Sequence, residues 1–469
     1  MIIKRAKEWG VDTSRIGMIG FSAGAGLTMH ATLHSKTMKL AFIGPIYGGM
    51  GPVEVPKNAP PMFNVIASDD FLFRGQFGVI DAWFKAGIPV EFHLYQNGGH
   101  GFGLGNPNRT SNRWFEAFTH WLNVNNFLKA KAEKNTNGLK DYYKNQFPIG
   151  VAVAPRMMLD TSAEAALIKK QFSSMTPENV MKMGPIHPEE NRYNWEPADK
   201  IADFAQKNGI LLRGHTLCWH NQTPNWLFKK DGQTVTKEEL LARLKTHITD
   251  VVTRYKGKVY AWDVVNEAIN DGGDKAMRES DFYKIIGEEY IEKAFEYAYA
   301  ADPKAKLFYN DYNTENAVKR ERIYQLLKKL KEKGVPINGV GLQGHWSIFE
   351  PSAAELEESI TKFASLGLEV QFTEVDVSVY PKQHQRSTEP FKGKAEFTPE
   401  MEAKQAAQYK MLFEVFRKHK DKITSVTFWN LSDQRSWLDN FPIPGRKDFP
   451  LLFDTNHQPK KAFWEVVKF

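Results

Sequence analysis

The sequence lacks the features that mark several broad classes of protein. It holds a single cysteine, Cys218, so no disulfide can form within the chain. No stretch approaches the run of about 18 uncharged apolar residues that a membrane-spanning helix needs, and the chain does not open on an apolar signal core. No run of basic residues stands out, although 62 lysines and arginines exceed 55 acidic residues. These absences argue against a disulfide-rich, membrane or nucleic-acid-binding protein.

The composition is that of a folded chain with more than one domain. Hydrophobic residues make up 42%, charged residues 25% and aromatics 13%, which excludes a disordered protein. A length of 469 residues suggests two or three domains. Apolar strand-like segments alternate with helical patterns along the whole chain, which indicates the α/β class.

The larger part of this alternation runs from residue 139 to residue 469. It contains eight candidate strands, each followed by a helical pattern, and therefore predicts a (β/α)8 TIM barrel. The expected strands lie near residues 148–154, 178–183, 211–219, 259–267, 306–311, 339–345, 370–376 and 424–430.

Polar and aromatic residues crowd the carboxyl ends of these strands, where the active sites of parallel barrels lie. Glu267 and Glu374 are 107 residues apart, which at roughly 35 residues per strand–helix unit places them on strands four and seven. Such strands face each other across the barrel mouth. Two facing carboxyls beside tryptophans suit glycoside hydrolysis, in which one carboxyl donates a proton and the other, ionised, attacks or stabilises the anomeric carbon.

A single glutamate at a strand end is more often structural than catalytic, but the whole set is not. The region resembles the glycoside hydrolase family 10 xylanases from about Leu139 to Phe469. The segments that carry the resemblance are Glu178-Asn179-Val180-Met181-Lys182, His187-Pro188-Glu189-Glu190, Arg213-Gly214-His215-Thr216-Leu217-Cys218-Trp219-His220, Trp262-Asp263-Val264-Val265-Asn266-Glu267, Gly341-Leu342-Gln343-Gly344-His345, Thr373-Glu374-Val375-Asp376 and Thr427-Phe428-Trp429.

The resemblance implies a retaining endo-β-1,4-xylanase that forms a covalent glycosyl-enzyme. By it, Glu267 is the general acid/base, Glu374 is the nucleophile, Asn266 bonds the sugar 2-hydroxyl and His345 orients Glu374. The remaining residues that it assigns to sugar subsites are Glu178, Asn179, Lys182, His215, Trp219, Gln343, Trp429 and Trp437.

Some residues of the region stay open or depart from the family pattern. Asp376 and His220 are either supports of the site or simply buried hydrogen-bonding residues. Asn430 stands where the family usually has glycine, and Met183 where an aromatic residue is common. These departures leave the chemistry intact but put the affinity of the subsites in doubt.

The resemblance also implies the partners. Xylan or xylo-oligosaccharides are the expected substrates, and no metal or cofactor is needed. No nucleic acid or membrane partner is expected, and the oligomeric state is not predicted. Because xylan is too large to enter cells, the expected location is secreted, cell-surface or periplasmic, although no signal peptide is visible.

Residues 1–128 form the second region, followed by a polar stretch, residues 129–138, that we interpret as a linker. Strands are expected near residues 15–20, 40–43, 62–67 and 90–95. The segment Gly20-Phe21-Ser22-Ala23-Gly24 follows the first strand and precedes a helix, as a nucleophile elbow does. Asp70 and His100 follow later strands in the order Ser, Asp, His, with Asp69 as an alternative acid.

This region resembles the carboxyl-terminal half of an α/β-hydrolase esterase of the acetyl-xylan or feruloyl type, which makes Ser22, Asp70 and His100 a possible triad. Several strands normally precede the elbow, and the loop that supplies the second oxyanion donor lies among them. We therefore expect a partial, truncated and inactive esterase domain. A bifunctional xylanase and carbohydrate esterase that also deacylates xylan is the alternative for the chain, and a non-catalytic glycan-binding barrel is a third hypothesis.

Overall fold

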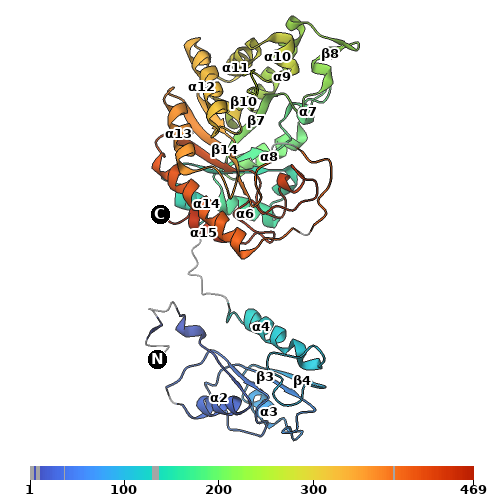
Figure 1. The fold of residues 1–469 in the computed structure, drawn as a ribbon, viewed down its shortest axis with the longest axis vertical. Helices are drawn as coiled ribbons and strands as arrows, with labels where there is room; N and C mark the ends of the chain where they lie inside the picture. The colour runs from blue at the N-terminus through green and yellow to red at the C-terminus, as the bar shows by residue number, and fades with distance from the viewer. Residues whose placement is uncertain (1–4, 7–10, 36, 129–136, 384–385, 394) are drawn as a thin grey trace. The chain divides into compact units, whose positions relative to one another are not determined.

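The computed structural model describes residues 5–6, 11–35, 37–128, 137–383, 386–393 and 395–469. The chain divides into two compact units, Met1–Thr136 and Asn137–Phe469 (Figure 1). Residues 129–136, which make up most of the expected linker, lie outside the described residues.

The first unit is built on a four-stranded parallel sheet in the order β1-β2-β3-β4. Strands β1 and β2 begin later in the sequence than the expected ranges 15–20 and 40–43, because their pairing begins only where Met18 lies opposite Ile43. The elements of this unit are β1 (Met18–Phe21), α2 (Ala23–His34), β2 (Ile43–Ile46), β3 (Met62–Ala67), α3 (Gly78–Lys85), β4 (Val90–Tyr95) and α4 (Trp114–Val124).

Buried apolar side chains give the first unit a core of its own. Every residue of β3 is buried, which explains why its sequence is a continuous apolar run apart from Asn64. Trp83 and Trp114 are fully buried in the same cluster. Strand β1 pairs on one side only among the described residues, and Ile19 and Phe21 on it are 39% and 38% exposed.

The second unit is a closed barrel of eight parallel strands. Each strand pairs with the next along the chain, and β15 pairs with β5 to close the ring. The strands are β5 (Ile149–Val153), β6 (Ser174–Pro177), β7 (Leu211–Trp219), β10 (Val259–Asn266), β11 (Lys306–Asp311), β12 (Gly339–Leu342), β14 (Glu369–Ser378) and β15 (Ile423–Phe428).

The second strand of the barrel is not where the sequence pattern placed it. We expected it near residues 178–183, but β6 ends at Pro177 and residues 178–182 form the loop that follows. Met183–Ile186 is a short helix, α7. The expectation was wrong because β6 is only four residues long and is defined by its pairing with β5 and β7, which the sequence pattern does not show. The expected range instead fell on the polar residues of the loop that follows β6.

Helices surround the barrel, and side-chain caps mark several of their starts. Thr236 and Glu239 form a capping box at the start of α9, and Ser352 and Glu355 form another at α13. The principal helices are α6 (Ala163–Gln171), α8 (Glu196–Lys207), α9 (Lys237–Arg254), α11 (Glu289–Ala301), α12 (Ala317–Glu332), α13 (Ala353–Ala364), α14 (Pro399–Lys418) and α15 (Lys461–Val466).

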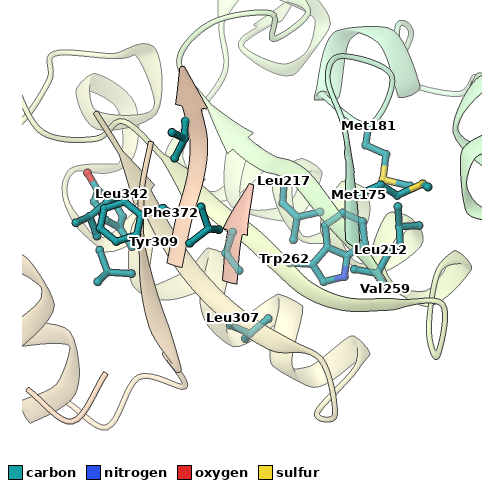
Figure 2. Packing of buried hydrophobic residues seen from close by; sticks show 14 of the residues in the cluster. Met175, Met181, Leu212, Leu217, Val259, Trp262, Leu307, Tyr309, Leu342 and Phe372 are labelled. Atoms are coloured by element: carbon teal, nitrogen blue, oxygen red, sulfur yellow. The ribbon is translucent and has the colours of Figure 1, made fainter. Parts of the chain in front are cut away.

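Apolar side chains of the strands pack tightly in the second unit (Figure 2). Trp262 on β10 is 1% exposed and lies against β7 at Gly214. A Cβ at Gly214 would come within 2.1 Å of the indole ring, so only glycine allows this close approach. Such dense packing holds the strand ends, and therefore the polar residues after them, in fixed positions.

Candidate functional site

The carboxyl ends of the barrel strands open onto a cavity of about 540 Å³. All the residues that the sequence assigned to sugar chemistry line it. They are Glu178, Asn179, Lys182, His215, Trp219, Asn266, Glu267, Gln343, His345, Glu374, Trp429 and Trp437.

Glu374 lies on the seventh barrel strand, β14, and its side chain is 6% exposed. Its Oε1 accepts a hydrogen bond of 3.0 Å from Asn310 Nδ2, and its Oε2 lies 3.1 Å from His345 Nε2. Burial favours the neutral carboxyl, but the His345 bond and nearby positive charge outweigh it, so the pKa of Glu374 lies below its ordinary value. This carboxyl is therefore held as an anion.

His345 links Glu374 to a second carboxylate. Its Nδ1 lies 2.9 Å from Asp376 Oδ2, which also accepts a 2.8 Å bond from Trp437 Nε1. Burial opposes a charged imidazole, but the two carboxylates overcome it and raise the pKa of His345 to about 10. An imidazolium thus lies between Glu374 and Asp376 at neutral pH. Asp376 is itself fully buried and lines the cavity, so it is both a buried hydrogen-bonding residue and a support of the site.

Glu267 follows the last residue of β10, the fourth barrel strand, and its side chain is 13% exposed. Its Oε2 accepts a 2.8 Å bond from Trp219 Nε1, and its Oε1 accepts bonds of 2.9 Å from Gln343 Nε2 and 3.2 Å from Asn266 Nδ2. These donors are neutral, whereas the partners of Glu374 include a cation. Glu267 and Glu374 therefore have different environments.

The aromatic and cationic walls of the cavity are also interlocked. Lys182 Nζ donates a 3.0 Å bond to Asn179 and lies 4.8 Å from the centre of the Trp219 ring. Burial lowers the pKa of Lys182, although Glu374 and the other cavity carboxylates oppose this effect. A lysine held in this way offers a donor to a sugar hydroxyl.

His215 and His220 come from the same strand segment but differ in their contacts. His215 Nδ1 lies 3.0 Å from Asp263 Oδ2, which fixes the ring beside Trp429. His220 Nδ1 lies 3.9 Å from Glu267 Oε2, and burial followed by the nearby Arg278 lowers the pKa of His220 to about 4. His220 is thus neutral next to Glu267.

Sequence reasoning missed Asn310, which is fully buried at the end of β11. Its Nδ2 donates to both Asn266 Oδ1, at 2.8 Å, and Glu374 Oε1, at 3.0 Å, while its Oδ1 accepts from Thr373. It therefore joins the fourth and seventh strands through the fifth. The sequence pattern that could have identified Asn310 is the one used for the other strands, because Asn310 and Asp311 are polar residues at the carboxyl end of an apolar strand.

The first unit brings its three expected site residues together. Ser22 Oγ lies 2.7 Å from His100 Nε2, and His100 Nδ1 lies 2.8 Å from Asp70 Oδ2. Ser22 has φ of 53°, a left-handed conformation that is unusual for serine and typical of a nucleophile elbow. Asp69 does not reach His100 in any described contact. It instead accepts the backbone N–H groups of Gly98 and Gly99.

Ser22 opens onto a smaller cavity of about 290 Å³. Tyr47 and Phe71 lie with ring centres 5.4 Å from that of His100, so aromatic side chains flank the base. The arrangement can activate a hydroxyl for attack on a carbonyl carbon.

Within the described ranges, no helix is both long and apolar enough to cross a bilayer. In the same ranges, no cluster of three or more histidine, cysteine, aspartate or glutamate side chains has the arrangement of a metal site.

Comparison with known proteins separates the two units in the same way. Residues 138–469 match glycosyl hydrolase family 10, and residues 1–132 match the dienelactone hydrolase family. A β-1,4-xylanase of Dictyoglomus thermophilum is 53% identical over 344 residues, which cover 73% of this chain and 94% of that protein. An endo-1,4-β-xylanase/feruloyl esterase of Xylanibacter ruminicola is 46% identical over 346 residues, covering 71% of this chain and 47% of that protein. The crystal structure of xylanase XynB from Paenibacillus barcinonensis, complexed with a conduramine derivative, is 46% identical with a TM-score of 0.68, covering 71% of this chain and 99% of that one.

Proposed function

The chain belongs to glycosyl hydrolase family 10 through residues 138–469, and we propose that the barrel cavity is where it cleaves its substrate. The second unit is an endo-1,4-β-xylanase, which hydrolyses internal xylosidic bonds of xylan with retention. The first unit is an α/β-hydrolase-like region. The residues that perform the xylanase reaction, and the finer identity of its substrates, are our proposals.

The observation that carries the assignment of roles is the difference between the two carboxyls. Glu374 is ionised beside a histidine cation, so it attacks the anomeric carbon and forms the glycosyl-enzyme. Glu267 is more exposed and meets only neutral donors, so it gives its proton to the departing oxygen. In the second step Glu267 takes a proton from water, which attacks the same carbon and releases Glu374.

The other cavity residues bind the sugar chain in this proposal. Trp219, Trp429 and Trp437 offer apolar ring faces to the pyranose rings. Asn266, which donates to Glu267, bonds the 2-hydroxyl, while Lys182 and Asn179 bind hydroxyls further along. Substrates are xylan and xylo-oligosaccharides, in keeping with a similar mutant enzyme solved in complex with xylotriose, 47% identical to this chain with a TM-score of 0.68. Because polymeric xylan does not enter cells, we place the reaction outside the cytoplasm.

The release of reducing sugar from xylan tests the two roles. Glu267→Gln should lower kcat/KM by about 10²–10⁴-fold, the scale of general acid–base catalysis. Glu374→Gln should lose more, on the order of 10⁵–10⁶-fold, as expected for a covalent nucleophile. Glu400→Gln, on the exposed surface of α14, is the matched control and should retain full activity. Unchanged hydrolysis by either cavity variant would contradict the assignment.

Ester hydrolysis at Ser22 is a second candidate function. The triad distances of 2.7 and 2.8 Å favour it, and they support the bifunctional alternative over an inactive remnant. The Ala23 backbone N–H is the donor that the elbow itself supplies to an oxyanion. If it acts alone, turnover should be about 10²–10³-fold below that of a complete site.

Acetyl- and feruloyl-ester hydrolysis by the full chain, compared with its Ser22→Ala variant, decides the matter. Turnover that disappears in the variant supports the bifunctional enzyme. Turnover that is absent, or that the variant retains, supports the inactive remnant. Xylanase activity of the same variant serves as the control that equal amounts of intact chain are compared.

A further inference from the structure

The peptide group that follows Glu267 is held at both of its polar ends. Its carbonyl oxygen, that of Glu267, accepts a 2.9 Å bond from Arg278 Nε. Its N–H, that of Ala268, donates a 3.0 Å bond to the hydroxyl of Tyr309. The N–H of Glu267 itself donates to the Asn310 carbonyl at 2.9 Å. Three consecutive polar groups of the backbone are therefore fixed around one glutamate.

This backbone needs such support because Glu267 has φ of 57°. A left-handed conformation costs a non-glycine residue on the order of 1–3 kcal/mol, and it persists only where the surroundings enforce it. With this backbone conformation the carboxyl of Glu267 lines the cavity. A change in the peptide that follows would therefore move the carboxyl.

Arg278 and Tyr309 are the two ends of one hydrogen-bonded chain. Arg278 Nη2 donates 2.9 Å to the Tyr312 hydroxyl, which donates 2.5 Å to Asp271. Lys319 then joins Asp271 to Asp311, with Nζ 2.8 Å from an oxygen of each.

This series of hydrogen bonds closes on the Glu267–Ala268 peptide, because the Tyr309 hydroxyl donates a 2.5 Å bond to Asp311 and accepts one from the Ala268 N–H. Lys319 and Asp311 are fully buried and paired. Burial raises the pKa of Asp311, although Lys319 opposes this effect. Burial opposes the charge of Arg278, but Tyr312, Glu267 and Asp311 outweigh it and raise the pKa of Arg278. A closed ring of hydrogen bonds and ion pairs has one well-defined arrangement.

We propose that Arg278 is a positioning residue for the xylanase reaction: it fixes the Glu267–Ala268 peptide and so aims the Glu267 carboxyl at the departing oxygen. Arg278 does not line the cavity in the described structure, so it acts through Glu267 and not on the sugar. Tyr309, which holds the other end of the same peptide, has the same role. The inference rests on the proposed function of Glu267 as general acid.

The test compares two substrates that differ only in how much they need an acid. A xylo-oligosaccharide has a poor leaving group and needs the proton of Glu267. A dinitrophenyl xylobioside has a leaving group that departs as a stable anion, so its kcat/KM, which reports the first step, barely depends on an acid. Arg278→Gln should lower kcat/KM on the oligosaccharide by about 10²-fold, the scale of a misplaced catalytic group. On the dinitrophenyl substrate the loss should stay below about threefold.

Three variants accompany this measurement. Tyr309→Phe removes one hydroxyl and should show the same dependence on leaving group, with a smaller loss. Arg278→Lys keeps the charge and one donor and should recover part of the loss. Arg322→Gln is the matched control and should match the wild type. Arg322 binds the carbonyls of Gly272 and Gly273, which lie between Glu267 and Arg278 in the sequence, but it does not contact the Glu267–Ala268 peptide in the described structure.

Equal losses on both substrates, for Arg278→Gln and Tyr309→Phe alike, would show a merely structural effect and overturn the proposal. No loss on either substrate would overturn it as well. Glu267→Gln measured in parallel separates this failure from failure of the proposed function. If Glu267→Gln itself shows no dependence on the leaving group, the role of Glu267 is wrong.

Discussion

Two buried histidines should make the barrel unit sensitive to acid. His187 Nδ1 and His247 Nδ1 are 3.1 Å apart, and His187 also lies 3.0 Å from the carbonyl oxygen of Glu190 through its Nε2. His247 is fully buried on α9. Because the Glu190 carbonyl can only accept, a neutral His187 carries its hydrogen on Nε2, and its Nδ1 accepts a hydrogen bond from the Nδ1–H of His247.

The magnitude follows from the pKa of His247. Burial, and then the charge of His187, lower it from its ordinary value of 6.5 to about 3. The unfolded chain therefore binds a proton below pH 6.5 that the folded chain refuses until about pH 3. Stability is complete above pH 6.5, and each pH unit below it removes about 1.4 kcal/mol, or about 2 kcal/mol at pH 5.

Urea unfolding followed by tryptophan fluorescence measures this loss, since eight of the 12 tryptophans lie in the barrel unit. His247→Asn should be less stable than the wild type at pH 7.5 but should lose about 2 kcal/mol less between pH 7.5 and pH 5. His457→Asn is the control, because His457 is less buried than His247 and its left-handed backbone conformation suits asparagine. A His247→Asn variant with the wild-type pH dependence would refute the reasoning.

Three further predictions concern the polar residues of the barrel. Asn310→Ala should lower kcat about 10²-fold through the lost donor to Glu374, with KM for xylo-oligosaccharides changed less. Asp376→Asn should move the acidic limb of the kcat/KM profile to higher pH, because the imidazole beside Glu374 loses its charge and no longer lowers the pKa of that carboxyl. Asp263→Asn should lower the free energy of unfolding in urea by about 3–5 kcal/mol, because Arg213 is 1% exposed and loses its buried partner.

The sequence was enough to predict the barrel and 12 of the residues that line its cavity, for a physical reason. Parallel strands buried on both faces are apolar, so a glutamate such as Glu267 at the end of one stands out against its neighbours. The chain order of the strands is also their order around the barrel, which places Glu267 and Glu374 on strands four and seven.

What the sequence did not reveal depends on contacts between distant segments. Strand β6 is only four residues long and is defined by its pairing with β5 and β7, so its position could not be read locally. The sequence predicted Asp70 as the acid and left Asp69 as an alternative, because the two are distinguished only by the turn after β3, which directs one carboxylate to His100 and the other to backbone N–H groups. The role that we propose for Arg278 could not be predicted from the sequence, because its side-chain partners lie in two separate segments, at Glu267 and Ile269 and at Tyr312.

The central claim, that Glu374 forms a covalent bond to the sugar, can be tested by trapping the intermediate. A dinitrophenyl xylobioside with fluorine in place of the 2-hydroxyl should react once and then stall, because fluorine slows both steps and the good leaving group speeds only the first. Mass spectrometry of the intact chain should show one added fluoroxylobiosyl group, and peptide mapping should place it on Glu374. The absence of an adduct, or an adduct on Glu267, would contradict the account.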